Sequence, residues 1–110
     1  MRTRPYLRAY MAGIVVPTLF LLVVVAVDAF VEVVVWRVPE PVPPSEHDFK
    51  YRLAYVVGGQ CVLRYDNERG KGDHLHTEAS EEPYAFSTPD QLLADFEAGV
   101  ARWNHEHGRS

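Results

Sequence analysis

The chain of 110 residues is long enough for one small domain, and it carries a formal net charge of −4 at pH 7. Its single cysteine excludes an intrachain disulfide framework and a cysteine-rich zinc site. All fifteen acidic residues lie from Asp28 onward, where they outnumber eight Lys and Arg residues. An acidic domain is a poor general binder of nucleic acid, so any such role depends on a local basic patch.

The first 28 residues form a hydrophobic segment with a basic tip. Residues 9–27 carry no charged side chain, and they follow Arg2, Arg4 and Arg8. A run of about 18 or more apolar residues is long enough to cross the hydrocarbon core of a membrane. The sequence therefore predicts an N-terminal transmembrane helix as an anchor, and the arginines predict that the N-terminus stays in the cytoplasm. A cleaved signal peptide and a buried strand are the alternatives, because both also contain an unbroken apolar run.

Residues 29–110 are predicted to form a separate α+β domain that begins with two strands. The β-branched and aromatic sequence of residues 29–38, AFVEVVVWRV, is typical of a largely buried strand. Four prolines within residues 39–44 exclude both helix and central strand, so this stretch is a stiff connection. Strict alternation of side chains in residues 49–57 indicates the second strand.

A hairpin is predicted at the Gly58-Gly59 pair, with residues 60–66 as the returning strand. A two-residue turn gives a register in which Tyr55 lies opposite Val62, Leu53 opposite Arg64 and Tyr51 opposite Asp66. Cys61 is expected to be a small buried apolar side chain in this strand. Glu32, in the preceding apolar strand, is expected to pair with Arg37 or Arg52.

The rest of the chain predicts a polar loop and one helix. Residues 67–80 are polar and rich in glycine, so they indicate a loop with a short strand at most, and residues 81–86 suit one further short strand. A helix is predicted to begin after Thr88, with Pro89 at its first position and a Thr-x-x-Gln capping box. Its apolar stripe consists of Leu92, Leu93, Phe96, Val100 and Trp103. The expected fold is a small antiparallel sheet with one C-terminal covering helix, preceded by the N-terminal hydrophobic helix.

Reactive side chains are concentrated in residues 64–76, RYDNERGKGDHLH. His74 and His76 share one face if this segment is extended, and such a pair supplies a base and an acid near neutral pH. Lys71 lies between two glycines, which lets the backbone approach an anion closely. The catalytic candidates are His74, His76, Lys71, Asp66 and Glu68. The RNA-binding candidates are Arg52, Arg64 and Arg69.

Three interpretations of this cluster remain open. In a ribonuclease without metal or cofactor, a histidine deprotonates the ribose 2′-hydroxyl, and Lys71 or Arg64 stabilises the charged phosphorane. In a metal site, Asp73, His74 and His76 are ligands, and Asp66 or Glu68 completes the shell. In the third, the segment is a solvated hairpin loop whose charges pair among themselves.

A family resemblance rests on five successive sequence blocks. From about Asp28 to Trp103 these are AFVEVVVWRVPEPVP, FKYRLAYV, RYDNERGKGDHLH, EEPYAF and LLADF. With them the chain resembles the TumE family, small toxins of bacterial and archaeal toxin–antitoxin pairs, whereas the hydrophobic segment lies outside the resemblance. The resemblance implies a growth-inhibiting toxin that acts as a ribonuclease and is neutralised by a small helix-turn-helix antitoxin, TumA.

The expected function is therefore a toxin that cleaves cellular RNA by His/Lys acid–base chemistry. The alternative is a non-enzymatic, membrane-anchored module whose acidic domain binds a basic protein partner. A ribonuclease held outside the membrane never meets cellular RNA. A cytoplasmic location is therefore the alternative to the membrane-anchored one.

Overall fold

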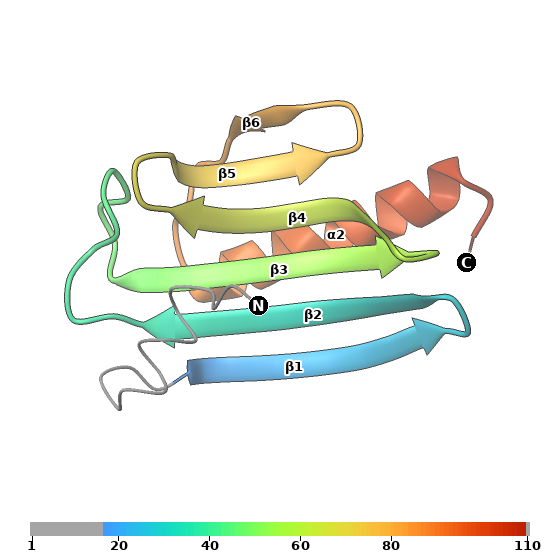
Figure 1. Ribbon diagram of the computed structural model, residues 1–110, viewed down its shortest axis with the longest axis horizontal. Helices are drawn as coiled ribbons and strands as arrows, with labels where there is room; N and C mark the ends of the chain where they lie inside the picture. Colours follow the sequence, from blue (N-terminus) through green and yellow to red (C-terminus); the bar gives the residue numbers. More distant parts are fainter. Residues whose placement is uncertain (1–16, 110) are drawn as a thin grey trace.

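Residues 17–109, which the computed structural model describes, form one six-stranded antiparallel sheet with a helix behind it (Figure 1). The elements are β1 (Pro17–Ala26), β2 (Ala29–Arg37), β3 (Phe49–Val57), β4 (Gln60–Glu68), β5 (Gly72–Thr77), β6 (Glu81–Pro83) and α2 (Pro89–Glu106). Each strand pairs with its neighbours in sequence, so the sheet is a simple meander. The predicted α+β class, with an antiparallel sheet and a C-terminal helix, is confirmed. We call the side covered by α2 the helix face and the opposite side, toward the viewer in Figure 1, the front face.

The hydrophobic segment contributes a strand to this sheet. The sequence predicts a transmembrane helix over residues 9–27, but residues 17–26 form β1, which pairs with β2 from Pro17 opposite Trp36 to Ala26 opposite Ala29. This part of the helix prediction is wrong, because consecutive valines favour a strand once β2 offers a hydrogen-bonding partner. The rest of the prediction lies outside the described residues. Between residues 17 and 109, no helix has the length and apolar character needed to span a membrane.

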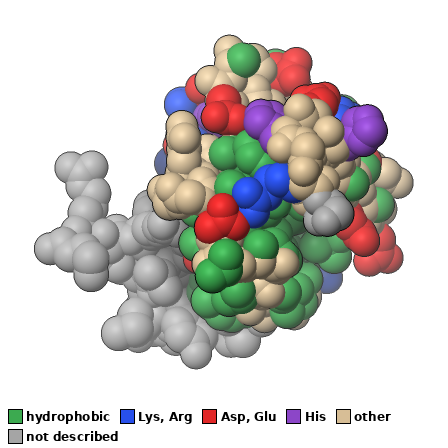
Figure 2. Space-filling model, turned by 90° about the vertical axis from the view of Figure 1, so that its right-hand side faces the viewer, with side chains coloured by type: hydrophobic (Ala, Val, Ile, Leu, Met, Phe, Trp, Pro, Cys, Tyr) green, Lys and Arg blue, Asp and Glu red, His purple; other side chains and the backbone are tan. Residues whose placement is uncertain are grey.

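Strand β1 is an edge strand that exposes apolar side chains on both sides. On one side Val24 is 76% exposed, and on the other Val25 is 51% exposed. Figure 2, which looks at the end of the molecule carrying the β1–β2 turn, shows hydrophobic side chains beside charged ones. At that turn Asp28 accepts two hydrogen bonds from the Arg109 guanidinium. The opposite edge strand, β6, is three residues long and ends in Pro83, a common way to limit further strand pairing.

The core lies on the helix face, because alternate residues of β2, β3 and β4 point toward α2. Its buried side chains are Ala29, Val33, Val35, Tyr51, Leu53, Tyr55, Val62, Leu63, Tyr65, Leu92 and Phe96. Aromatic rings meet edge to face between strand and helix, as in the pair Tyr55 and Trp103, whose centroids are 5.7 Å apart. On the front face a smaller buried group contains Val34 and Trp36.

The β3–β4 hairpin has the predicted turn but a different register. Val57 pairs with Gln60 across the two glycines, as expected, yet Tyr55 pairs with Leu63 because the register shifts next to Val56. This β-bulge moves every later pair by one residue, so that Asp66 lies opposite Arg52 and not opposite Tyr51. The shift puts Asp66 on the front face with Arg52.

The two side-chain expectations for these strands have opposite outcomes. Arg52 donates to Glu32 Oε1 at 2.8 Å, so the predicted pairing of Glu32 with one of two arginines is confirmed. Cys61 is exposed, so the prediction that it is buried is wrong. The reason is its position beside the exposed turn, at the second residue of β4.

Helix α2 begins and packs as the sequence predicts. The Thr88 side chain accepts a hydrogen bond from the Gln91 N–H at 3.1 Å, and Pro89 occupies the first turn. In the apolar stripe, Leu92 and Phe96 are buried, and the other members pack at the margin of the same core. Gly99 is also buried and faces β4.

Replacing Gly99 with alanine tests how closely α2 approaches the sheet. At an exposed helix position this change stabilises by about 1 kcal/mol. At Gly99 the new Cβ would lie 2.8 Å from Leu63 Cδ2, so we expect overpacking to lower the unfolding free energy by about 1–3 kcal/mol. Urea unfolding measures the effect. Ala98→Gly on the exposed side of α2 is the control, because it measures the Ala/Gly difference in helix propensity without any packing effect, and it should destabilise by about 1 kcal/mol. A stabilised Gly99→Ala protein contradicts the expectation.

Candidate active site

The predicted reactive residues come together on the front face of β4 and β5. Residues of β4 pair directly with those of β5, so that Arg64 lies opposite His76 and Asp66 opposite His74. Since side chains alternate along a strand, these four project from the front face. β6 adds Glu81, which lies opposite His76. Together with Lys71 from the β4–β5 turn, these residues form what we call the histidine cluster.

His76 lies between two carboxylates. Its Nε2 is 3.5 Å from Asp66 Oδ1, and its Nδ1 is 3.7 Å from Glu81 Oε2. The other oxygen of Asp66 is 3.0 Å from Arg64 Nε. Both ring nitrogens therefore face acceptors, an arrangement that suits the form of the ring in which both nitrogens carry hydrogen.

His74 is held in a different way. Its Nδ1 lies 2.9 Å from the carbonyl oxygen of Gly72, which can only accept, so Nδ1 carries the hydrogen and donates it. Its Nε2 is then the unprotonated nitrogen of the uncharged ring, 3.9 Å from Glu81 Oε1. The two imidazole centroids are 6.1 Å apart. One strand face thus presents two histidines with different hydrogen-bonding roles.

Glu81 connects the cluster, although no sequence pattern selects it. Besides both histidines, it accepts a hydrogen bond from Lys71 Nζ at 3.4 Å. Burial alone would raise the pKa of Glu81, but the positive charges of His76 and Lys71 and the hydrogen bond from Lys71 outweigh it and lower that pKa. In the sequence Glu81 is one of two adjacent glutamates in a short polar segment, and only the β5–β6 pairing distinguishes it from Glu82.

Glu81→Gln is expected to weaken the acid sensitivity of the fold. A carboxyl group whose pKa is lowered by folding adds stability above its ordinary pKa of 4.5, and this stability is lost as the pH falls through the lower folded value. The unfolding free energy of the variant should therefore fall less steeply between about pH 5 and pH 3 than that of the wild type. Denaturant titrations at several pH values measure this slope. Glu82→Gln, which removes a carboxylate from the other side of β6, should leave the slope unchanged.

The other candidates lie around the cluster and not within it. Arg52 is next to Asp66 in the sheet but pairs with Glu32. Glu68 is exposed at the end of β4, and Arg69 is exposed in the turn that follows. Lys50, which the sequence did not select, lies on the same face as Arg52 and donates to the backbone carbonyl of Asn67. Burial lowers the pKa of Lys50, against the opposing charges of Asp66 and Glu68.

The three metal ligands proposed from the sequence are not assembled. Asp73 is adjacent to His74 in β5, so its side chain points to the helix face, where the Tyr51 hydroxyl donates to it at 2.7 Å. His74 and His76 remain together on the front face. In residues 17–109 no group of three or more His, Cys, Asp or Glu side chains is arranged to hold a metal ion.

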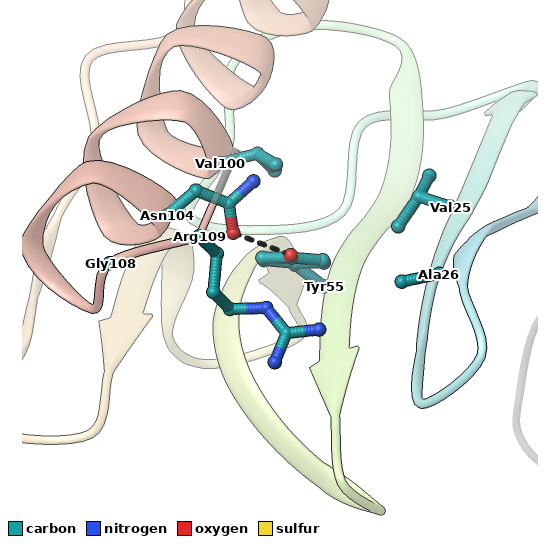
Figure 3. A pocket seen from close by; sticks show the side chains of 7 residues that line it. All are labelled: Val25, Ala26, Tyr55, Val100, Asn104, Gly108 and Arg109. Carbon is teal, nitrogen blue, oxygen red and sulfur yellow. Dashed lines mark hydrogen bonds between the residues drawn. The ribbon is translucent and has the colours of Figure 1, made fainter.

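A pocket of about 390 Å³ lies on the helix face, between the end of β1 and the C-terminal end of α2 (Figure 3). It is lined by Val25, Ala26, Tyr55, Val100, Asn104, Gly108 and Arg109. The Tyr55 hydroxyl donates to Asn104 Oδ1 at 2.6 Å beside it. The pocket shares no residue with the histidine cluster, so it is not part of the candidate active site.

Comparison with known proteins identifies the family. The fold and the cluster define a small meander sheet that presents two histidines on one face, with Arg64 opposite His76 and Lys71 in contact with Glu81. The family model described as "Toxin TumE" matches residues 12–104, and the chain therefore belongs to the TumE toxin family. Membership implies the toxin of a toxin–antitoxin system, with a cognate antitoxin as partner. The match starts before Asp28, where the resemblance was expected to begin, and it includes β1. Neither a curated protein nor a solved structure matches the chain.

Proposed function

We propose that this toxin is a metal-independent ribonuclease that cleaves cellular RNA at the histidine cluster. The observation that carries the proposal is the pair His74 and His76, whose ring centroids are 6.1 Å apart on one strand face, with Arg64 opposite His76 and Lys71 in contact with the shared Glu81. A phosphodiester of RNA contains its own nucleophile, the 2′-hydroxyl, so cleavage needs only a base, an acid and stabilisation of charge. Each of these roles has a candidate in the cluster.

His74 is the proposed general base. Because its Nδ1 hydrogen is donated to the Gly72 carbonyl, its Nε2 is free to take the proton of the 2′-hydroxyl. The 2′-oxygen then attacks the adjacent phosphorus and forms a phosphorane. Positioned bases of this kind typically contribute about 10²–10⁴-fold to a rate.

His76 is the proposed general acid. With hydrogen on both nitrogens, it is oriented by Asp66 and Glu81 and donates a proton to the departing 5′-oxygen. The P–O5′ bond breaks, and the products are a 2′,3′-cyclic phosphate and a free 5′-hydroxyl. His74 then carries the proton that came from the 2′-hydroxyl, and His76 has lost one, so exchange with water restores both.

Lys71 and Arg64 are the proposed charge-stabilising groups. Lys71 is half exposed and contacts Glu81 at 3.4 Å, so its ammonium is free to move toward a bound phosphate. Arg64 is held beside Asp66, which fixes its guanidinium next to His76. A cation aimed at the charge that develops on the phosphorane is worth about 10²–10³-fold in typical enzymes. These two residues offset the acidic character of the domain where RNA must bind.

Incubation of the purified full chain with a short RNA in EDTA tests this function. We expect cleavage in the chelator, products that end in a 2′,3′-cyclic phosphate, and no cleavage at a position where the 2′-hydroxyl is replaced by hydrogen. Cleavage that requires added metal would contradict the metal-independent mechanism. Intact RNA under all conditions would overturn the ribonuclease proposal.

The partner is proposed to be a helix-turn-helix antitoxin encoded beside the toxin. Family membership supports an antitoxin, and the net charge of −4 favours a partner that offers a basic surface. Induction of the full chain in a bacterial culture should stop growth and degrade RNA, and coexpression of the antitoxin should restore both. Growth arrest with intact RNA would favour the non-enzymatic alternative, in which the domain acts by binding another protein.

A further inference from the structure

A second polar cluster lies on the helix face, directly behind the histidines. At its centre the Asp73 carboxylate accepts hydrogen bonds from Ser45 Oγ at 2.5 Å and from the Tyr51 hydroxyl at 2.7 Å. His47 Nε2 is 2.6 Å from the same carboxylate. Tyr51 is fully buried and Ser45 is 6% exposed. One carboxylate of β5 is therefore held by three side chains from β3 and the loop before it.

The donor and acceptor roles inferred from the hydrogen-bond partners indicate that this cluster stabilises the fold and does not carry out chemistry itself. His47 Nδ1 accepts the N–H of Phe49 at 3.2 Å, so the ring hydrogen is on Nε2 and points at Asp73. Burial, with the hydrogen bond to Asp73, raises the pKa of Tyr51 far above its ordinary value, so its hydroxyl remains a donor. Ser45 bonds to Asp73 and not to His47, so no base activates it as a nucleophile.

The same loop holds the turn that precedes His74. The N–H of Gly70 donates to the carbonyl of Pro43 at 2.8 Å. Gly72 has φ +77°, and a Cβ there would lie 3.0 Å from Pro44 Cγ. The carbonyl of Gly72, which accepts the Nδ1 hydrogen of His74, thus lies between two anchors: Pro44 on one side and Asp73 on the other.

We propose that Asp73 is a positioning residue of the active site. By fixing the first residues of β5 from the helix face, it places the Gly72 carbonyl so that His74 is held as the Nδ1–H tautomer with Nε2 free as the base. The catalytic consequence rests on the proposed ribonuclease function. The tautomer itself is measured without activity, so the two proposals fail separately.

The test compares Asp73→Asn with wild type in the full chain. The asparagine NH₂ cannot accept hydrogen, so at least one of the three donors loses its acceptor. In a two-bond ¹H–¹⁵N spectrum at about pH 8, where imidazole is uncharged, we expect wild-type His74 in the Nδ1–H form and the variant as a mixture of tautomers. We also expect kcat on RNA to fall by about 100-fold, as for other small misplacements of a catalytic group, with little change in KM.

Asp95→Asn is the matched control. Asp95 also accepts a short hydrogen bond from a tyrosine hydroxyl, that of Tyr84 at 2.5 Å, but it lies on α2 and, among the described residues, makes no hydrogen bond or ion pair with β5. This variant should keep the His74 tautomer and kcat of the wild type. A proteolysis or thermal unfolding assay confirms that both variants are folded.

Each outcome decides the proposal. A folded Asp73→Asn protein with the wild-type tautomer of His74 overturns it, whatever its activity. A changed tautomer in a chain that never cleaves RNA supports the positioning role and removes the ribonuclease. If Asp73→Asn does not fold, Ser45→Ala removes one donor only. A shift of the same kind but smaller is then expected, and an unchanged spectrum overturns the proposal.

Discussion

Full-length protein with His74→Ala or His76→Ala is expected to cleave RNA about 10²–10⁴-fold more slowly than wild type, the usual contribution of a positioned acid or base. In the proposed mechanism each residue has its own proton transfer to make, and the nearest other titratable groups are already engaged. Asp66 contacts both Arg64 and His76, and Glu81 contacts Lys71 and both histidines. Initial rates on a short RNA of defined sequence measure the loss. His105→Ala, at an exposed position near the end of α2, should retain the wild-type rate.

The pH profile separates the two roles. A reaction that needs one unprotonated base and one protonated acid gives a bell-shaped dependence of kcat/KM on pH. The His74 variant should lose the rise on the acid side, where the base becomes unprotonated. The His76 variant should lose the fall on the alkaline side, where the acid loses its proton. Unchanged limbs in both variants would contradict the acid–base assignment even if the rates were low.

A modified leaving group gives a sharper test of the assignment. If the 5′-oxygen of the scissile bond is replaced by sulfur, the leaving group departs without protonation, because a thiolate is far more stable than an alkoxide. The His76 variant should then approach the wild-type rate on this substrate, whereas the His74 variant should remain slow. The reverse pattern would exchange the two roles. If neither variant is rescued, the proposed mechanism is contradicted.

The parts of the fold that depend on local sequence were predictable. The helix start at Thr88 and Pro89 is encoded by neighbouring residues that satisfy the first backbone N–H groups, and the strand 49–57 by strict alternation. The hairpin turn was likewise visible in the Gly58-Gly59 pair. Its register was not, because the local sequence contains no signal for the bulge next to Val56.

The apolar segment shows where composition is insufficient. A long uncharged run has the same composition whether it becomes a helix in lipid or an edge strand, and the difference lies in the partner that β2 provides. Residues 29–38 were predicted as a strand, but the turn between β1 and β2 contains no glycine pair that would have indicated a hairpin. The turn is made by Val27 and Asp28.

The candidate site was predictable only on one strand face. His74, His76 and Lys71 follow from an H-x-H pair in an extended segment, and pairing with β4 adds Asp66 and Arg64. Glu81 and the partners of Asp73 were not visible, because they come from a different strand and from the loop before β3. Once β5 is recognised as a strand, the alternation of side chains does place Asp73 on the other face of the sheet from His74 and His76. That point alone would have removed the three-ligand metal site.

Asn67→Ala is expected to lower the free energy of unfolding by about 2–6 kcal/mol, because it leaves one buried and one partly buried backbone group unsatisfied at about 1–3 kcal/mol each. Asn67 is fully buried. Its Oδ1 accepts the N–H of Tyr51 at 2.9 Å, and its Nδ2 donates to the carbonyl of Phe49 at 2.8 Å. The regular pairing of β3 and β4 ends at Arg52 and Asp66, so beyond this point the side-chain amide of Asn67 replaces the peptide groups of the ladder.

The same substitution should also disturb the active site, since Asn67 Nδ2 lies 3.3 Å from Ser45 Oγ, a donor to Asp73. Denaturant unfolding gives the free energy, and the His74 tautomer gives the effect on the site. Asn104→Ala is the control. It removes one hydrogen bond to the Tyr55 hydroxyl at the margin of the pocket and should cost about 1 kcal/mol, the typical net contribution of one hydrogen bond. A loss for Asn67→Ala no larger than this would show that the Asn67 amide does not stabilise β3 and β4 beyond the Arg52–Asp66 pair.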